Sequence, residues 1–223
     1  MRTLQHNTDL CVIGGGMSGL CCAIAAARHG IKVVLIHDRP VLGGNASSEI
    51  RMWIGGCHGK DNREGGIIEE IMLENFYQNP SLKYPLWDSV LYEKAIAESN
   101  ITLLLNSSCL DCTMDGEKIV SVKAWQSNAE TFHVVTAKYF ADCSGDSILA
   151  PLTGAEFRVG REAKAEFNEE KEVTKNTVPC YGGERNEYHS ECSLDLCKEC
   201  STKLREVIYK NFAHITDYYG LQI

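Results

Sequence analysis

The sequence lacks three features that would assign a protein to a broad class at once. It has no apolar stretch long enough to cross a membrane as a helix. Residues 1–8 are polar and contain no apolar core of the kind found in signal peptides, so we expect neither a signal peptide nor a transit peptide. It has no excess of basic residues, because 30 acidic against 22 basic residues give a formal net charge of -8. We therefore expect a cytoplasmic protein that binds neither nucleic acid nor a membrane.

The composition is otherwise that of a globular protein, with 44% hydrophobic and 23% charged residues among 223. This length allows one large core or two small ones. Eleven cysteines are a high and odd count, but Cys11, Cys21 and Cys22 lie within apolar segments. A thiol there behaves as a small hydrophobic group, and without an export signal we expect no disulfide framework.

Residues 9–36 have the pattern of a strand, a glycine turn, a helix and a second strand. Residues 10–13 are a continuous apolar run, which is typical of a parallel strand covered on both faces. The segment 14–19 (GGGMSG) follows at once, and the small residues after it favour a helix that ends near Gly30. Residues 31–36 supply the second apolar strand, so the segment predicts a βαβ unit.

The glycines of this turn predict a site for a dinucleotide. Gly14 permits the sharp turn, Gly16 lets a pyrophosphate approach the main chain, and Gly19 lets the helix pack close to the strand. The helix N-terminus then offers free N–H groups and a partial positive charge to the phosphates. The alternative is a glycine turn without a ligand. The position of the turn between a strand and a helix favours the nucleotide.

The second strand ends at His37, Asp38 and Arg39. An acidic residue at this point normally binds a ribose hydroxyl. His37 holds the usual position, and Asp38 is next to it. We see no arginine cluster for a 2′-phosphate, although Arg39 alone does not exclude one.

A polar loop rich in small residues follows, with residues 41–51 reading VLGGNASSEIR and residues 53–59 reading WIGGCHG. These residues are too small and too polar to form a core. We expect a loop whose N–H groups and hydroxyls line a ligand.

The remaining elements complete an α/β pattern. Apolar residues recur at helical spacing over residues 66–78, and a second helix is expected from Asp88, a plausible N-cap, to Ser99. Residues 101–105 read as a buried strand that returns to the first sheet. Three segments rich in β-branched and aromatic residues then predict an antiparallel meander over residues 111–114, 118–125 and 132–140.

The glycine turn, the run from Asp38 to Arg51 and the segment 53–56 together resemble one family. They are similar to the FAD-dependent oxidoreductases related to the flavin subunit of heterodisulfide reductase, within the glutathione-reductase-like FAD-binding superfamily. The resemblance covers residues 8–168. It implies a Rossmann-like FAD-binding domain (1–168) with a parallel sheet and an inserted three-stranded antiparallel meander. It stops near Glu170, where family members continue further, so we expect a truncated member.

The resemblance also implies cofactor contacts outside the first turn. Gly145 would let the main chain approach FAD, and the carboxylate of Asp146 would bind the flavin's hydroxyl chain, although alone these residues read as a simple turn. The main chain near Cys109 would lie against the adenine. The expected cofactor-binding residues are Gly14, Gly16, Met17, Ser18, Gly19, His37, Asp38, Arg39, Gly43, Gly44, Asn45, Ser47, Cys109, Ser144, Gly145 and Asp146.

Catalytic residues are harder to predict than cofactor contacts. Glu49, Arg51 and His58 are polar residues in the loop expected nearest the flavin ring, where general acid-base groups would lie. Solvated loop residues are the alternative. Cys57 would be a redox thiol facing the flavin, but no Cys-x-x-Cys motif accompanies it, which favours a buried structural thiol.

Residues 169–223 are expected to form a loop and a helical C-terminal segment. Cys192, Cys197 and Cys200 have the spacing of three ligands of a two-iron cluster, and Cys180 or His189 would complete an iron-sulfur or zinc site. However, apolar residues share a helix face with Cys197 and Cys200, which favours packing over a metal. Such an exposed face would let copies of the chain associate as a homo-oligomer.

Three functions fit these observations. The first is an FAD-dependent oxidoreductase, or its FAD-binding half, which transfers hydride or electrons between bound flavin and a small-molecule substrate or an electron-transfer partner. The second is a non-catalytic module that binds an adenine nucleotide or a partner chain. The third is a nicotinamide-binding domain, which the meander and residues 144–146 disfavour.

Overall fold

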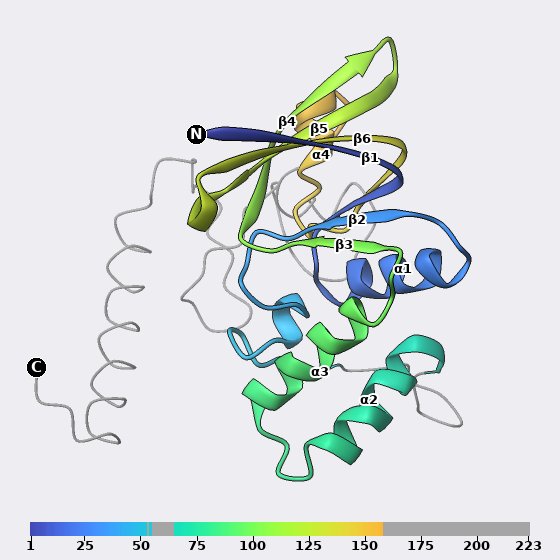
Figure 1. Cartoon of the computed structure of the whole chain (residues 1–223), viewed down its shortest axis with the longest axis vertical. Coiled ribbons are helices and arrows are strands. Elements are labelled where there is room, and N and C mark those ends of the chain that lie inside the picture. Colours follow the sequence, from blue (N-terminus) through green and yellow to red (C-terminus); the bar gives the residue numbers. More distant parts are fainter. Residues whose placement is uncertain (53, 55–64, 158–223) are drawn as a thin grey trace, which may run out of the picture. The chain divides into compact units, whose positions relative to one another are not determined.

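The computed structural model describes residues 1–52, 54 and 65–157, shown as the coloured ribbon in Figure 1. The described residues belong to one compact unit, Met1–Phe157. The candidate residues Cys57 and His58 and the cysteines proposed as metal ligands lie outside the described residues.

One six-stranded sheet organises this unit, in the order β3-β2-β1-β6-β5-β4. The first three strands of that order and β6 are mutually parallel, whereas β4, β5 and β6 form an antiparallel meander. The strands are β1 Arg2–Ile13, β2 Val33–Ile36, β3 Ile101–Leu104, β4 Ser107–Asp115, β5 Lys118–Gln126 and β6 Thr131–Asp142. The helices are α1 Met17–Arg28, α2 Gly66–Gln78, α3 Tyr84–Ile96 and α4 Leu149–Thr153, with short 3-10 turns η1 Gly44–Ala46 and η2 Ser127–Ala129.

The predicted α/β fold with a meander is therefore confirmed, and β6 shows how its two parts join. This strand pairs with β5 on one side and runs parallel to β1 on the other, with Ile13 opposite Asp142. Because Ile13 is also opposite Ile36 of β2, the carboxyl ends of these strands meet at one edge. The segments that leave the strands there are brought together, and ligands of open α/β sheets bind at such an edge.

The first strand is longer than the sequence pattern predicts. The apolar run begins at Leu10, but β1 begins at Arg2. Its early residues are polar and mostly exposed, yet they pair with β6 from Thr131 onward, while β2 pairs only with residues 10–13. Ladder hydrogen bonds to β6 hold these polar residues in the strand conformation.

Helix α3 also differs from the prediction, because it begins at Tyr84 and not after an Asp88 cap. The Asn79 side chain fixes the turn before it, since its Oδ1 accepts the N–H of Lys83 at 2.8 Å and its Nδ2 donates to the carbonyl of Lys83 at 2.9 Å. Pro85 then occupies the first helical turn, where its missing N–H costs nothing. Asp88 lies inside the helix, buried, and serves another purpose described below.

The core consists of two clusters of buried side chains, one on each face of the sheet. Val12 and Leu35 pack with residues of α1, α2 and α3, whereas Ile13 and Ile36 pack with α4 and the meander. All four residues of β2 are buried, as its apolar run predicts. Cys11 is fully buried beside Cys109, and burial raises the pKa of the Cys109 thiol to about 11. These two thiols therefore act as apolar packing groups.

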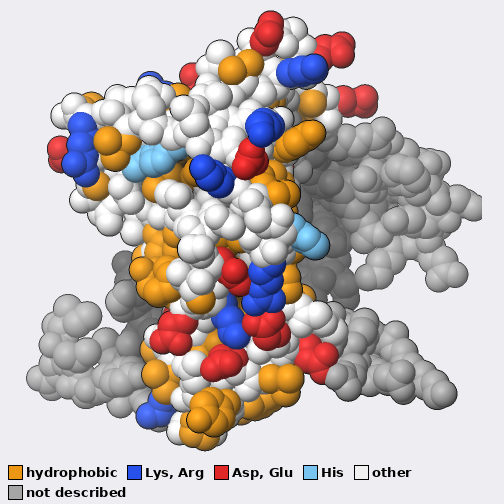
Figure 2. Space-filling view, turned by 45° about the vertical axis from the view of Figure 1, so that its right-hand side comes forward, with side chains coloured by type: hydrophobic (Ala, Val, Ile, Leu, Met, Phe, Trp, Pro, Cys, Tyr) orange, Lys and Arg blue, Asp and Glu red, His pale blue; other side chains and the backbone are white. Residues whose placement is uncertain are grey.

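Charged side chains tie α1 to α2 and α3 on the surface. The Arg28 guanidinium contacts Glu70 at 2.7 Å and Glu98 at 2.7 Å, and Lys94 contacts Glu70 at 3.0 Å. The two cations hold the pKa of Glu70 at about 2. Figure 2 shows basic and acidic side chains side by side in the lower half of the coloured part, above a hydrophobic end. Within the described ranges, no helix is long and apolar enough to span a membrane.

Two hydrogen-bonded histidines, the buried His133 and the half-buried His6, lie toward the other end of β1 and β6. Gln126 donates its amide to the carbonyl of Leu105, so its Oε1 is the acceptor for His133 Nε2 at 3.2 Å. The remaining ring nitrogen of His133 then accepts a hydrogen bond from His6 Nε2 at 2.9 Å. This arrangement requires a neutral His133, and burial lowers the pKa of both rings below 6.5.

We predict that the free energy of unfolding decreases as the pH falls below about 6.5, where the unfolded histidines gain protons that the folded pair does not bind. Urea unfolding between pH 7 and 5.5 measures this slope. This range lies above pH 4.5, the ordinary pKa near which the unfolded Glu70 carboxylate gains a proton and its own stabilising contribution begins to be lost. His133→Gln should reduce the slope. His29→Gln, at an exposed position, should keep the wild-type slope, and an unchanged slope in His133→Gln would contradict the assignment.

Candidate functional site

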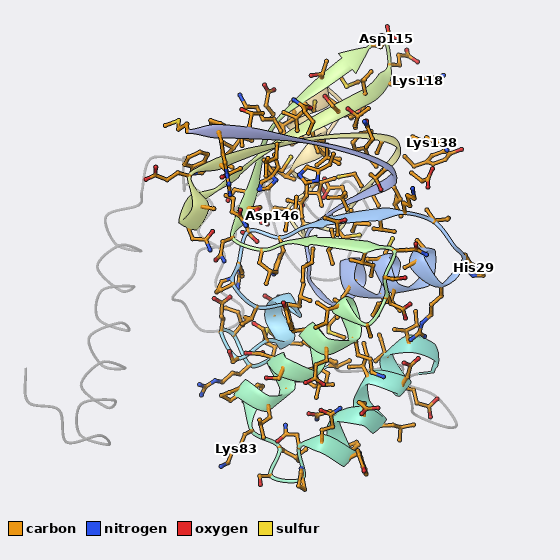
Figure 3. All side chains as sticks on the ribbon, in the orientation of Figure 1. His29, Lys83, Asp115, Lys118, Lys138 and Asp146 are labelled. Atoms are coloured by element: carbon orange, nitrogen blue, oxygen red, sulfur yellow. The ribbon has the colours of Figure 1, made fainter. Side chains whose placement is uncertain are left out.

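A cleft of about 730 Å³ opens at the carboxyl ends of β1, β2 and β6. All the predicted cofactor contacts line it except Gly19 and Ser47. Asp146, labelled in Figure 3, lies at this edge of the sheet. The structure thus brings together three segments that are far apart in the sequence, namely residues 14–18, 37–45 and 143–146.

Main-chain contacts that only glycine permits hold these segments together. Gly14 has a φ of +101°, and a Cβ there would collide with the main chain of Cys143. A Cβ on Gly19 would collide with the carbonyl of Gly14, so α1 packs closely on the turn that follows β1. Gly43, at a φ of +105°, donates its N–H to the carbonyl of Gly15 at 2.9 Å. The floor of the cleft is therefore bare main chain.

Gly16 differs from these glycines because the fold itself does not require it. Its φ of -64° suits any residue, and the nearest atom to an added Cβ is the Cα of Gly44 at 4.0 Å. Gly16 lines the cleft, so the space that a side chain would fill is cleft space. A glycine at this position fits a ligand that approaches the main chain.

The start of α1 gives this part of the cleft its electrostatic character. Gly16 is the N-cap and makes no side-chain cap hydrogen bond, and the first turn contains no acidic residue. The N–H groups of Met17 and Ser18 therefore lie at the positive end of the helix dipole, beside the bare main chain of Gly16. Such a helix start attracts phosphate groups. These residues fit the pyrophosphate of a dinucleotide.

His37, expected at the ribose position, has both ring nitrogens occupied. Its Nδ1 accepts the N–H of Gly15 at 2.9 Å, and its Nε2 donates to the carbonyl of Val41 at 3.0 Å. Asp38 Oδ1 lies 3.3 Å from the same Nδ1, but this is no ion pair, because burial lowers the pKa of His37 and Nδ1 is already an acceptor. His37 thus joins two loops of the site. The Asp38 carboxylate lies beside His37, lines the cleft and is 62% exposed, so it is accessible to a ligand.

The start of β4 forms another wall of the cleft. Ser107, Ser108, Cys109 and Leu110 all line it, a wider contact than Cys109 alone. The N–H of Ser107 binds the carbonyl of His37 at 2.8 Å, so this wall is fixed to the end of β2.

Several cleft residues were not predicted from the sequence. Ile13 and Ile36 end β1 and β2, and Cys143 directly follows β6, so their position at strand ends was the signal that could have found them. Ala46 belongs to the polar loop, and Met52 and Ile54 follow it. Ile148 directly precedes α4.

One face of α3 holds the loop of residues 43–51 in place. Trp87 Nε1 donates to the carbonyl of Ala46 at 2.9 Å, and the buried Asp88 accepts the N–H of Ser48 at 2.9 Å. Leu91 packs against Gly43, where an added Cβ would lie 2.6 Å from its Cδ1. Tyr84, Trp87, Asp88 and Leu91 have the spacing of one helix face. The sequence pattern identified this helix but not the contacts of Asp88.

Glu49 and Arg51, the two predicted catalytic residues that the structure describes, do not line the cleft. Glu49 lies 3.4 Å from the guanidinium of Arg39, and Arg51 donates from Nε to the carbonyl of Ser48 at 2.9 Å. Ser47 is buried, and its Oγ accepts the N–H of Glu49 at 3.3 Å. A catalytic role for Glu49 or Arg51 stays a prediction. Over the residues that the structure describes, no group of three or more potential metal ligands is found.

Removing the Asp88 carboxylate should loosen the loop of residues 43–51. We predict that Asp88→Ala leaves the N–H of Ser48 unpaired and lowers the free energy of unfolding by about 1–3 kcal/mol. Asp88→Asn keeps an acceptor and should recover most of the loss. Urea unfolding checks both variants. Equal losses in the two would show that this hydrogen bond does not stabilise the loop.

Comparisons with known proteins relate this chain to oxidoreductases of several kinds. The sequence model of the family described as FAD dependent oxidoreductase matches residues 9–213. Glycerol-3-phosphate dehydrogenase of Mycobacterium leprae is 38% identical over 66 residues, which are 30% of this chain and 11% of that protein. Fumarate reductase (cytochrome) of Shewanella frigidimarina is 45% identical over 47 residues, which are 21% of this chain and 8% of that protein. The matches thus span about a tenth of the length of these relatives.

Two solved structures give the scale of the structural likeness. The glycerol-3-phosphate dehydrogenase from Bacillus halodurans complexed with FAD aligns with 66% of this chain and 36% of its own, at 16% identity and a TM-score of 0.46. The flavin-dependent brominase Bmp2 aligns with 66% of this chain and 40% of its own, at 19% identity and a TM-score of 0.47.

The family match extends over most of the chain and includes every segment of the cleft. The bare main chain at Gly16 and the uncapped start of α1 fit the cofactor that the family's description names. This chain therefore belongs to the FAD dependent oxidoreductase family.

Proposed function

We propose that this chain is the FAD-binding part of a flavin-dependent oxidoreductase and that FAD lies along the cleft. The main support is Gly16, a cleft glycine that neither its backbone conformation nor its neighbours require. The cofactor and the protein would have different roles in the reaction. FAD supplies the transfer of hydride or electrons, and the protein supplies binding, orientation and electrostatics.

Each wall of the cleft has a proposed role. The N–H groups of Met17 and Ser18 would bind the pyrophosphate, and the Asp38 carboxylate would accept hydrogen bonds from ribose hydroxyls. The Ser107–Leu110 main chain would lie against the adenine. The remaining proposed contacts are Gly14, Gly19, His37, Arg39, Gly43, Gly44, Asn45, Ser47, Ser144, Gly145 and Asp146, with Gly19, His37 and Ser47 acting through the packing and hydrogen bonds described above.

The proposal extends to the organisation of the chain. Residues 1–168 would be the FAD-binding domain and residues 169–223 a separate segment. The run from Asp38 to Arg51 supports a relation to the flavin subunit of heterodisulfide reductase. The family match extends to residue 213, so the likeness does not stop near Glu170 as expected from the sequence. The partner would be a small-molecule substrate or an electron-transfer protein. The homo-oligomer and the cytoplasmic location stay predictions.

Replacing Gly16 separates ligand binding from folding. We predict that Gly16→Ala changes the free energy of unfolding by no more than about 0.5 kcal/mol, because the fold has room for the Cβ. The same Cβ would occupy the phosphate position and raise the Kd for FAD tenfold or more, about 1.4 kcal/mol. Titration of FAD by flavin fluorescence, alongside urea unfolding, measures both quantities.

Gly30→Ala is the matched control for this variant. Gly30 has a φ of +80°, lies outside the cleft and has no atom within 4 Å of an added Cβ. The substitution should cost about 1 kcal/mol of stability through backbone strain and leave the Kd for FAD unchanged. Wild-type FAD affinity in Gly16→Ala would refute the proposed position of the cofactor.

A further inference from the structure

A second pocket adjoins the flavin cleft and shares Ala46, Met52 and Ile54 with it. Its volume is about 330 Å³, which suits a small ligand. Its other walls come from α2, from α3 and from the turn between them, where Lys83 is labelled in Figure 3. The proposed function does not use this pocket.

The interior of this pocket is apolar. Phe76, Leu82 and Trp87 line it with the thioethers of Met52 and Met72, and none of the described lining residues is charged. The Asn79 amide is already engaged, because it bonds Asn75 and both main-chain groups of Lys83. Phe76 and Leu82 remain 56% and 53% exposed, so an occupant would remove apolar surface from water. The walls therefore favour the apolar body of a ligand.

The guanidinium of Arg51 lies beside these apolar walls. The guanidinium carbon of Arg51 lies 5.4 Å from the centre of the Tyr84 ring, and Tyr84 lines the pocket. Arg51 uses its Nε for the carbonyl of Ser48. Among the described residues its two terminal amino groups have no hydrogen-bond or ion-pair partner. A guanidinium with two free amino groups is suited to a carboxylate.

Hydrogen bonds hold the main chain of Arg51 in an energetically unfavourable conformation. Its φ of +62° is uncommon for a residue with a side chain. Three hydrogen bonds keep it there: Arg51 N–H to the carbonyl of Ser47 at 2.8 Å, Tyr84 Oη–H to the carbonyl of Arg51 at 3.1 Å, and Met52 N–H to the carbonyl of Asn45 at 2.8 Å. Strained residues that their surroundings hold in this way concentrate at ligand sites.

We propose that this pocket binds a small carboxylate with an apolar body and that Arg51 pairs with its carboxylate group. The apolar body occupies the space between α2 and α3, and the charged group stays at the Tyr84 side. Because Met52 and Ile54 belong to both cavities, this ligand is a substrate or product of the flavin reaction. That last identification rests on the proposed function, whereas the binding itself does not.

Two probes of the same shape test the role of the charge. The full chain loaded with FAD is titrated with 2-naphthoate and with its neutral analogue 2-naphthamide, using calorimetry. The expected Kd for naphthoate is at least tenfold lower than for naphthamide. Arg51→Gln should bring the two values together by weakening naphthoate alone, and Lys118→Gln, in the hairpin labelled in Figure 3, should change neither. Equal affinities in the wild type, or a preference that survives Arg51→Gln, overturn the proposal.

Filling the pocket tests its location. Met72→Trp should weaken both probes at least tenfold, whereas Tyr77→Trp, on the same helix at a position that is 85% exposed, should weaken neither. Unfolding curves show that both variants are folded, and unchanged binding in Met72→Trp overturns the assignment. A chain that retains no FAD would refute the proposed function instead, and the same titrations on that FAD-free chain would still decide whether the pocket binds the carboxylate.

Discussion

Contact between main-chain atoms at the ends of β1, β2 and β6 is the constraint on which the site depends. Gly14 lies against the main chain of Cys143, and Gly19 lies against Gly14. Gly44 lies close to Gly16, since a Cβ added to Gly44 would be 3.1 Å from the Gly16 Cα. No residue with a side chain fits at Gly14 or Gly19. These contacts set the distance between the loops, and the cleft exists because the loops meet without side chains between them.

The hydrogen bonds around this contact fix the loops from two sides. The neutral ring of His37 bonds Gly15 and Val41 and so joins the first turn to the second. On the other side Trp87 and Asp88 bond the main chain of Ala46 and Ser48. Helix α3 thus supports the loop of residues 43–51 with one face, and Tyr84 of the same face donates to the carbonyl of Arg51. One helix therefore shapes both the cleft and the pocket beside it.

The sequence predicted the parts of this fold that depend on local pattern. The apolar run of β2, the glycine turn and the bounds of α2 follow from burial and helical spacing, and the structure has them. It did not predict the polar first half of β1, because the pairing with β6 joins residues more than a hundred positions apart. The predicted start of α3 was wrong for a similar reason, because it depends on contacts between residues that the local pattern does not show. Asp88 has the chemistry of a cap, but its partner is Ser48, and the Asn79 side chain fixes the turn before the helix.

Amide hydrogen exchange on the full chain, with and without FAD, tests the central claim most directly. If FAD lies along the bare main chain, exchange should slow together at residues 14–18, 43–45 and 144–146. Exchange at the Asp115–Lys118 hairpin tip, far along the meander, should not change. Unchanged exchange at the glycine segments, or slowing at only one of them, would contradict a single cofactor held between the three.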